Sequence, residues 1–107
     1  MSSKKLTIKA DTKYTLKFVP DALREWQSLD GSIKQLLKPL LAKRLQNPHV
    51  PGSVLHRELE GCYKIKLLKQ GYRLVYLVEE DVMVVMVLSV GKREDSEAYM
   101  TAAKRIK

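Results

Sequence analysis

The fold is decided by Cys62-Tyr63-Lys64-Ile65-Lys66-Leu67-Leu68 and by the two apolar segments that follow it, residues 72–78 and 82–90. Apolar and polar side chains alternate through the first segment, which is typical of a β-strand with one buried face. Gln70-Gly71 and Glu80-Asp81 separate the segments, and such short polar breaks favour hairpin turns. The sequence therefore predicts three consecutive antiparallel strands.

The residues ahead of these strands predict one further strand and two helices. Residues 14–18 alternate between apolar and polar side chains. Pro20 suits the first position of a helix, where its missing N–H costs nothing, and this helix is expected to end before Gly31. Ser32 and Gln35 have the spacing of a capping box for a second helix, whose leucines recur at helical intervals.

The C-terminal part completes the predicted order β-α-α-β-β-β-α. Gly91 is expected to close the third strand of the meander, and Asp95 or Ser96 to cap a final helix. This order is an α+β fold, a small antiparallel sheet with two N-terminal helices packed on one face and a C-terminal helix. With 107 residues, the chain is expected to form a single domain over residues 13–107, preceded by a basic N-terminal arm over residues 1–12.

The net charge of +8 indicates the kind of partner that the chain meets. The most favoured partner is nucleic acid, followed by an acidic protein. An anionic membrane is the least favoured, because no apolar run approaches the ~20 residues that span a bilayer. The N-terminus has no apolar signal-peptide core, and a single cysteine, Cys62, suits a reducing cytoplasm. Two histidines and one cysteine, far apart in sequence, offer no metal-ligand spacing, so no cofactor is expected.

Cations gather on one face of the first hairpin of the meander. Strand alternation puts Lys64 and Lys66 together on the side away from the helices, and a two-residue turn adds Arg73 diagonally to Lys66. No acidic residue occurs between Glu60 and Glu79. A charged solvent face would explain any one of these lysines, whereas a cluster without counter-charge is better explained by a phosphate ligand.

Two residues near the C-terminus complete the candidate site. Arg93 follows a strand end, where it would meet a bound phosphate, although an ion pair with Glu94 or Glu97 would also explain it. Tyr99 lies about one turn into the final helix, as a base-stacking group or as a packed aromatic.

The remaining chemically active side chains have plainer explanations. His49 and His56 lie in or beside a proline-rich loop, away from the cations in sequence, and are expected to be surface residues. Cys62 is expected to be a small packed residue, and Trp26 a core residue on the first helix.

Four segments, taken in order, resemble the RelE-type toxins of bacterial toxin–antitoxin pairs, within the RelE/ParE superfamily. They are LEGCYKIK (59–66), GYRLVY (71–76), VGKRE (90–94) and SEAY (96–99), and the likeness extends over residues 14–106, including LREW (23–26) in the first helix. The basic arm and Pro39 in the second helix depart from the family pattern, and neither removes a candidate site residue.

The resemblance implies a ribosome-dependent endoribonuclease that cuts mRNA in the ribosomal A site and so inhibits translation. The ribose 2′-hydroxyl would attack the adjacent phosphate, leaving a 2′,3′-cyclic phosphate and a 5′-hydroxyl. Lys64 and Lys66 would share proton transfer, and Arg73 would hold the phosphate. Arg93 would stabilise the phosphorane or protonate the leaving oxygen, and Tyr99 would orient the base. Further RNA contacts are expected at the outlying cations, Lys69, Lys92, Lys104 and Arg105.

The resemblance also implies partners and leaves two alternatives open. The expected partners are a bacterial 70S-type ribosome with its mRNA, and an acidic RelB-like antitoxin that covers or displaces the final helix; operator DNA would be met only through the antitoxin. ParE-type toxins share the fold but inhibit DNA gyrase and lack the basic set. The other alternative is a non-catalytic module that binds RNA or antitoxin through the same face.

Overall fold

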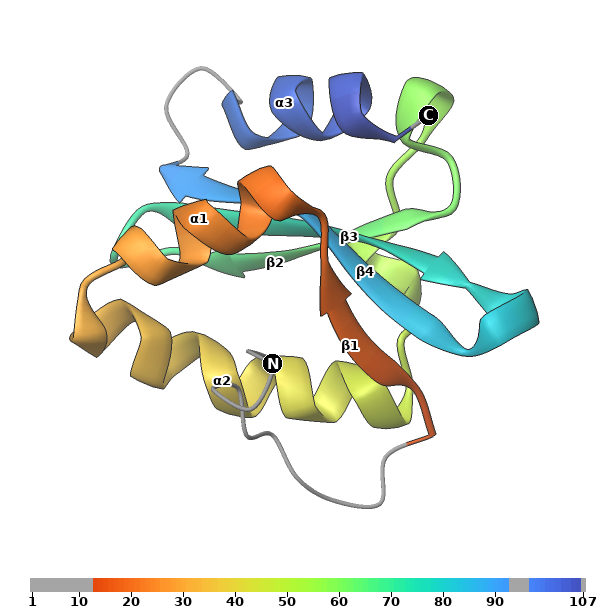
Figure 1. The fold of residues 1–107 in the computed structure, drawn as a ribbon, viewed down its shortest axis with the longest axis horizontal. Coiled ribbons are helices and arrows are strands. Elements are labelled where there is room, and N and C mark those ends of the chain that lie inside the picture. Colours follow the sequence, from red (N-terminus) through yellow and green to blue (C-terminus); the bar gives the residue numbers. More distant parts are fainter. Residues whose placement is uncertain (1–12, 93–96, 107) are drawn as a thin grey trace.

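The computed structural model describes residues 13–92 and 97–106, so the expected arm over residues 1–12, Arg93 and the expected caps Asp95 and Ser96 lie outside the described part. The elements follow the predicted order (Figure 1). They are β1 (Thr15–Phe18), α1 (Pro20–Ser28), α2 (Gly31–Gln46), β2 (Cys62–Leu67), β3 (Tyr72–Glu79), β4 (Val84–Lys92) and α3 (Glu97–Arg105), with short 3₁₀ turns at Pro51–Ser53, Arg57–Leu59 and Glu80–Val82.

The four strands form one sheet in the order β1-β4-β3-β2. Strands β2, β3 and β4 are the predicted antiparallel meander. The expectation of a wholly antiparallel sheet is wrong at one edge, because β1 runs parallel to β4. Between β1 and β4 the chain forms α1, α2, β2 and β3, and a parallel pair requires a long connection of this kind. The sheet is therefore mixed, and the α+β class is confirmed.

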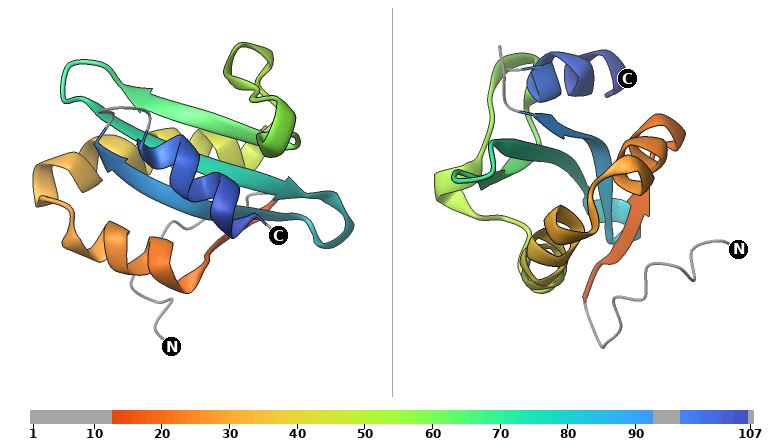
Figure 2. Two further views of the ribbon diagram at one scale, coloured as in Figure 1. Left: turned by 90° about the horizontal axis from the view of Figure 1, so that it is seen from above. Right: turned by 90° about the vertical axis from the view of Figure 1, so that its left-hand side faces the viewer.

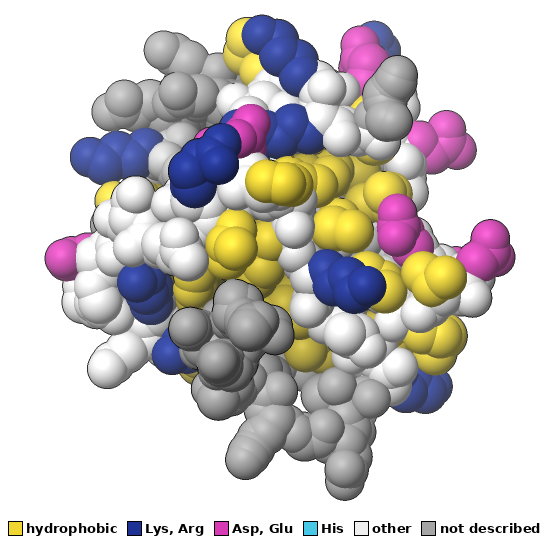
Figure 3. All heavy atoms as spheres, viewed as in Figure 1, with side chains coloured by type: hydrophobic (Ala, Val, Ile, Leu, Met, Phe, Trp, Pro, Cys, Tyr) yellow, Lys and Arg dark blue, Asp and Glu magenta, His cyan; other side chains and the backbone are white. Residues whose placement is uncertain are grey.

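Helices α1 and α2 cover one face of the sheet (Figure 2). Their buried side chains recur at helical spacing and meet the apolar side of β2, β3 and β4, forming the larger core cluster. The members from the helices are Ala22, Trp26, Ile33, Leu37, Leu41 and Leu45. Trp26 is 4% exposed, which confirms it as a core residue. On the side of the molecule seen in Figure 3, hydrophobic side chains gather centrally, with Lys and Arg side chains around them.

Helix α3 lies across the other face of the sheet (Figure 2). A smaller core cluster joins them, with Ala102 from α3 packed among Cys62, Val75 and Leu88 from the strands. The two clusters give β2, β3 and β4 buried side chains on both faces, over part of their length. The face opposite α1 and α2 is therefore partly covered, and cations occupy the part that α3 leaves open.

Three local expectations are wrong in detail. Helix α2 begins at Gly31 with Asp30 as its N-cap residue, so Ser32 lies inside the helix, where its hydroxyl donates to the Asp30 carboxylate. The β2–β3 turn spans four residues, 68–71, because Leu67 pairs with Tyr72. Strand β4 continues through Gly91 to Lys92. Within the described residues, no helix is long and apolar enough to cross a membrane.

Candidate functional site

A row of three directly paired residues crosses the sheet near the β2–β3 turn. Lys66 on β2 pairs with Arg73 on β3, and Arg73 pairs in turn with Gly91 on β4. Paired residues project from the same face, with Cβ atoms of neighbours about 5 Å apart. The four-residue turn is two residues longer than expected, and a shift of two preserves the face of every side chain. Arg73 is therefore opposite Lys66 instead of diagonal to it.

Lys64 extends this row along β2. It lies two residues from Lys66 and pairs with Val75, whose side chain is buried beneath α3. Residues two apart on a strand share a face, so Lys64, Lys66 and Arg73 form one basic cluster, which we call the cation face. Lys66 is exposed, and Lys64 and Arg73 are half-buried. Within the described residues, none of the three has a carboxylate within ion-pair distance.

Tyr99 brings α3 into contact with this cluster. The Arg73 guanidinium carbon lies 4.7 Å from the centre of the Tyr99 ring, a cation–π arrangement. Burial raises the pKa of the Tyr99 phenol, while the neighbouring Arg73 acts in the opposite direction, so the hydroxyl is protonated at neutral pH. The buried Arg73 Nε has no hydrogen-bond partner among the described residues. A donor in that position is suited to an anionic ligand.

The backbone that carries Lys64 is held from the opposite side of the sheet by a residue that the sequence analysis missed. Arg44 on α2 donates to the Lys64 carbonyl oxygen at 3.0 Å and to the Tyr76 hydroxyl at 2.9 Å. Tyr76 donates in turn to the Pro48 carbonyl at 2.8 Å. The available signal was an arginine among the leucines of the second helix, because a partly buried side chain of this kind needs polar partners.

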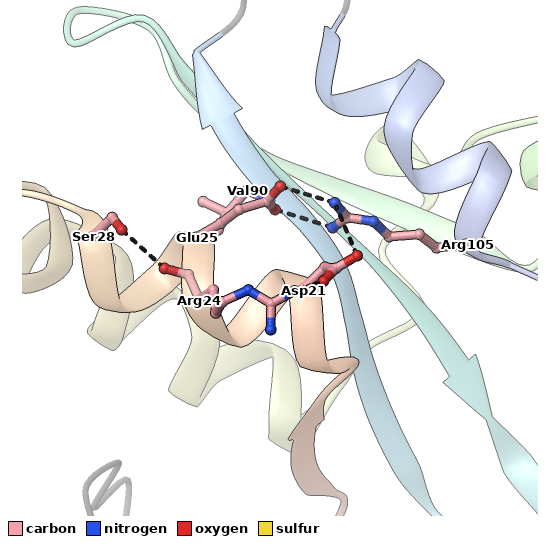
Figure 4. Close-up of a pocket in the computed structure, with 6 residues that line it drawn as sticks. All are labelled: Asp21, Arg24, Glu25, Ser28, Val90 and Arg105. Atoms are coloured by element: carbon pink, nitrogen blue, oxygen red, sulfur yellow. Dashed lines mark hydrogen bonds and ion pairs between the residues drawn. The ribbon is translucent and has the colours of Figure 1, made fainter.

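The outlying cations divide into two groups. Lys69, in the β2–β3 turn, and Lys104, on α3, are exposed and have no ion pair with a described residue. Lys92 pairs with Tyr72, which puts its side chain on the face opposite Arg73. Arg105 is bound within the fold, because its guanidinium is paired with Glu25 (Figure 4). The structure thus gathers Lys64, Lys66, Arg73 and Tyr99, and separates Lys92 and Arg105 from them.

The histidines lie apart from the cation face, whereas Cys62 shares its side of the sheet but is buried. His49 is paired with Glu80, and its ring lies 5.9 Å from the ring of Tyr63, which packs on the side of α1 and α2. His56 is exposed beside the Arg57–Leu59 turn. Cys62 is fully buried, and this burial raises the pKa of its thiol to about 11, which makes it a poor nucleophile at neutral pH.

The chemistry available at this site is that of binding an anion and stabilising its charge. Two ammonium groups and a guanidinium occupy one face, and Gly91 leaves space beside them: a Cβ added there would meet no described atom within 4 Å. Fixed cations stabilise a pentacovalent phosphorane without rearranging during the reaction. Within residues 13–92 and the described part of α3, no three His, Cys, Asp or Glu side chains are grouped to hold a metal ion.

Known proteins resemble this chain over most of its length. The sequence profile of the ParE toxin of type II toxin–antitoxin systems, parDE, matches residues 16–97. The mRNA interferase toxin RelE of Escherichia coli (strain K12) is 47% identical over 93 residues, covering 87% of this chain and 97% of the relative. A putative RelE-like toxin protein of E. coli is 45% identical over 95 residues, or 89% of this chain and 99% of the relative.

Solved structures show the same arrangement of elements. A mutant of E. coli toxin RelE in the free state superposes with a TM-score of 0.80 at 45% identity, covering 89% of this chain and 99% of that one. The toxin of the intact E. coli RelBE toxin–antitoxin complex gives a TM-score of 0.72 at 44% identity, over 76% and 98% of the two chains. With a profile match over most of its length and relatives covered almost end to end, the chain belongs to the RelE-type toxins of the RelE/ParE family of type II toxin–antitoxin systems.

Proposed function

We propose that this toxin is a ribosome-dependent endoribonuclease that cuts mRNA in the ribosomal A site and thereby stops translation. The observation that carries the proposal is the cation face, on which Lys64, Lys66 and Arg73 lie together without a described carboxylate partner and with Tyr99 over Arg73. The name of the K12 relative, mRNA interferase toxin RelE, supports the same activity.

The reaction is a transesterification within the RNA strand. The 2′-hydroxyl oxygen forms a bond to phosphorus while the bond from phosphorus to the 5′-oxygen breaks, giving a 2′,3′-cyclic phosphate and a 5′-hydroxyl. Lys64 and Lys66 share the proton of the 2′-hydroxyl, and Arg73 holds the scissile phosphate. Arg93, two residues beyond Gly91 in the chain, neutralises the phosphorane or supplies the proton to the 5′-oxygen.

Tyr99 is assigned to the base next to the scissile phosphate. One face of its ring is turned to the Arg73 guanidinium, so a base would stack on the remaining face. In this arrangement the ring also fixes the guanidinium, because a stacked arginine loses most of its freedom to rotate. Lys69 and Lys104 are assigned to contacts with the RNA backbone at the edge of the site.

The proposed dependence on the ribosome rests on the lack of a histidine acid and base at the cation face. A self-sufficient ribonuclease of this chemistry uses an acid and a base that both exchange protons near neutral pH, usually histidines. Among the described residues both histidines lie away from the cation face. An enzyme without them gains most from a substrate held in the reactive conformation, and such positioning supplies several kcal/mol of a barrier.

An acidic antitoxin of the RelB type is the proposed protein partner. Solved complexes of E. coli RelE with RelB, and of a RelE mutant with a RelB peptide, support this pairing. A net charge of +8 favours an acidic partner segment, and we assign operator DNA binding to the antitoxin. The toxin would act in the cytoplasm, where ribosomes and mRNA are found.

The experiment is primer extension on a defined mRNA with programmed ribosomes. Wild-type protein is compared with Lys66→Ala and Arg93→Ala, and with a reaction that contains no ribosomes. Lys38→Ala, an exposed lysine on α2, is the charge-matched control. Cuts within the A-site codon that need ribosomes, persist in the control and disappear in both variants would support the proposal. A folded wild-type protein that makes no cut would refute it.

Gyrase inhibition is a second candidate, because the matching profile is described as that of a ParE toxin. It predicts gyrase-dependent DNA breaks while the mRNA stays intact. The basic set and the 47% identity to an mRNA interferase favour RNA cleavage over this candidate. A non-catalytic RNA-binding module would show a different pattern again: Lys66→Ala would weaken RNA binding and leave any cleavage unchanged.

A further inference from the structure

Strand β4 loses its neighbour halfway along one edge. Strand β1 pairs with β4 only from Val84 to Val87, where β1 ends. At the next residue, Leu88, the pairing of β4 with β3 skips one position, so that Tyr76 pairs with Val87 and Val75 with Ser89. Beyond this β-bulge the backbone groups of β4 on the side of β1 have no strand to bind among residues 13–92. This stretch leads directly to Gly91, which pairs with Arg73 of the cation face.

Two side chains take the place of the missing strand (Figure 4). The Val90 N–H donates to Glu25 Oε1 of α1 at 3.2 Å, and Arg105 of α3 donates to the Leu88 carbonyl at 2.7 Å. Arg105 and Glu25 also bind each other, through Nη1 to Oε1 at 3.1 Å and Nη2 to Oε2 at 3.0 Å. Asp21, at 4.0 Å from Arg105 Nη2, adds a weaker attraction. We call these two residues, Glu25 and Arg105, the clasp.

The clasp fixes the end of α3 opposite Tyr99. Tyr99, Ala102 and Arg105 recur every three residues, so they lie along one face of the helix. Ala102 is fully buried against the sheet, Tyr99 lies on Arg73, and Arg105 is bound in the clasp. A helix of nine residues is unstable by itself in water and depends on such contacts for its place.

We propose that Glu25 and Arg105 are positioning residues that set Tyr99 over Arg73 and hold the end of β4 in register with the cation face. This assignment rests on the proposed function, and it removes Arg105 from the expected RNA contacts. The Arg105 side chain is 20% exposed, and its guanidinium already binds a carboxylate and a carbonyl, so little of it is left for a phosphate. The clasp acts on the reaction through Tyr99 and touches no reacting atom.

Two conservative substitutions separate positioning from RNA binding. Arg105→Lys keeps the charge but loses the forked contact, and Glu25→Gln removes a negative charge that would only repel RNA. A positioning role predicts that both lower the single-turnover cleavage rate on programmed ribosomes, by about 10- to 100-fold, because small displacements of a positioning group have effects of that size. An RNA contact at Arg105 predicts instead that Arg105→Lys is nearly neutral and that Glu25→Gln does not slow cleavage.

A double-substitution cycle tests whether the effect runs through Tyr99. The Arg105→Lys change should cost little further rate in a Tyr99→Ala background, because coupled residues are not additive. Arg24→Ala is the control, since this exposed residue lines a pocket together with Glu25 and Arg105 but pairs with Asp21, outside the clasp. Additive losses, or a comparable loss in the Arg24 control, would overturn the assignment.

A spectroscopic measurement tests the geometry without relying on cleavage. The protein has five tyrosines, so 3-fluorotyrosine labelling gives five ¹⁹F signals, of which Tyr99 is identified by its loss in Tyr99→Phe. In Arg105→Lys and Glu25→Gln the Tyr99 signal should move toward that of the free amino acid, while the buried Tyr14 and Tyr76 keep theirs and report an intact fold. An unmoved Tyr99 signal would refute the clasp even if the wild type cuts RNA. A moved signal in a protein that cuts nothing would retain the clasp and reject the proposed function.

Discussion

Replacing Gly91 with alanine adds one methyl group to the sheet beside the cation face. Gly91 pairs directly with Arg73, so the new Cβ would project beside the guanidinium. No described atom lies within 4 Å of that position, and Gly91 is not among the residues with a left-handed backbone. The fold therefore has room for the methyl group, whereas a phosphate bound between Lys66 and Arg73 would have to share that space with it.

The expected result is a protein that is more stable and less active. Gly→Ala at a permissive backbone position stabilises by about 0.4–1 kcal/mol, because the unfolded chain loses freedom, which raises Tm by roughly 2–6 °C. Displacing the phosphate by about 1 Å would lower the single-turnover cleavage rate by about 100-fold. Gly31→Ala, at the start of α2, is the control, with equally open surroundings far from the cations. Cleavage at the wild-type rate by Gly91→Ala would show that no phosphate approaches this part of the sheet.

Three further predictions concern stability and partner binding. In the folded protein the Cys62 thiol has a pKa of about 11, whereas in the unfolded chain it loses its proton near pH 9. The free energy of unfolding should therefore be constant below pH 9 and should fall between pH 9 and pH 11, by at most about 2–3 kcal/mol. When the free energy of unfolding is measured in guanidinium chloride at each pH, it should fall less steeply for Cys62→Ala than for the wild type. The same pH dependence in both proteins would contradict a raised pKa at Cys62. Tyr76→Phe should lower the free energy of unfolding by about 1–3 kcal/mol, since it leaves the Pro48 carbonyl without its donor and removes an acceptor from Arg44; an unchanged thermal transition would count against this network. Lys104→Glu should slow association with an acidic antitoxin by about 3- to 10-fold at low salt, with the difference shrinking as salt screens it; stopped-flow rates that match the wild type would argue against α3 as the docking region.

The sequence predicted the parts of the site that depend on strand alternation. The pattern around Lys64 and Lys66 fixes which side chains share a face, and the side chains of Ile65 and Leu67 must be buried on the other side. The turn length was wrong, yet Arg73 still reached the expected face, because an error of two residues leaves the alternation intact. The local pattern was sufficient here because side chains on a strand return to the same face every two residues.

Features set by contacts between distant segments could not be predicted in this way. The parallel pairing of β1 with β4 depends on how α1 and α2 cross the sheet. Lys92 was expected to contact RNA; the strand continues through Gly91 to Lys92, and alternation turns the Lys92 side chain to the face opposite Arg73. Arg105 looked like one more cation in a basic tail, and its partner Glu25 is 80 residues away in the chain.

The distribution of ion pairs explains how a strongly basic domain can be stable and still keep a reactive face. Both carboxylates of α1 form ion pairs: Glu25 with Arg105, and Asp21 with Arg24. Glu80 is paired with His49. None of these acids reaches Lys64, Lys66 or Arg73, so the mutual repulsion of the cation face is left in place. That repulsion is relieved when an anion binds, whether it is the phosphate of an RNA or the carboxylates of an antitoxin. A cation cluster without carboxylate partners among the described residues would attract both an RNA phosphate and an acidic antitoxin, and predicts that the two compete for the same cations.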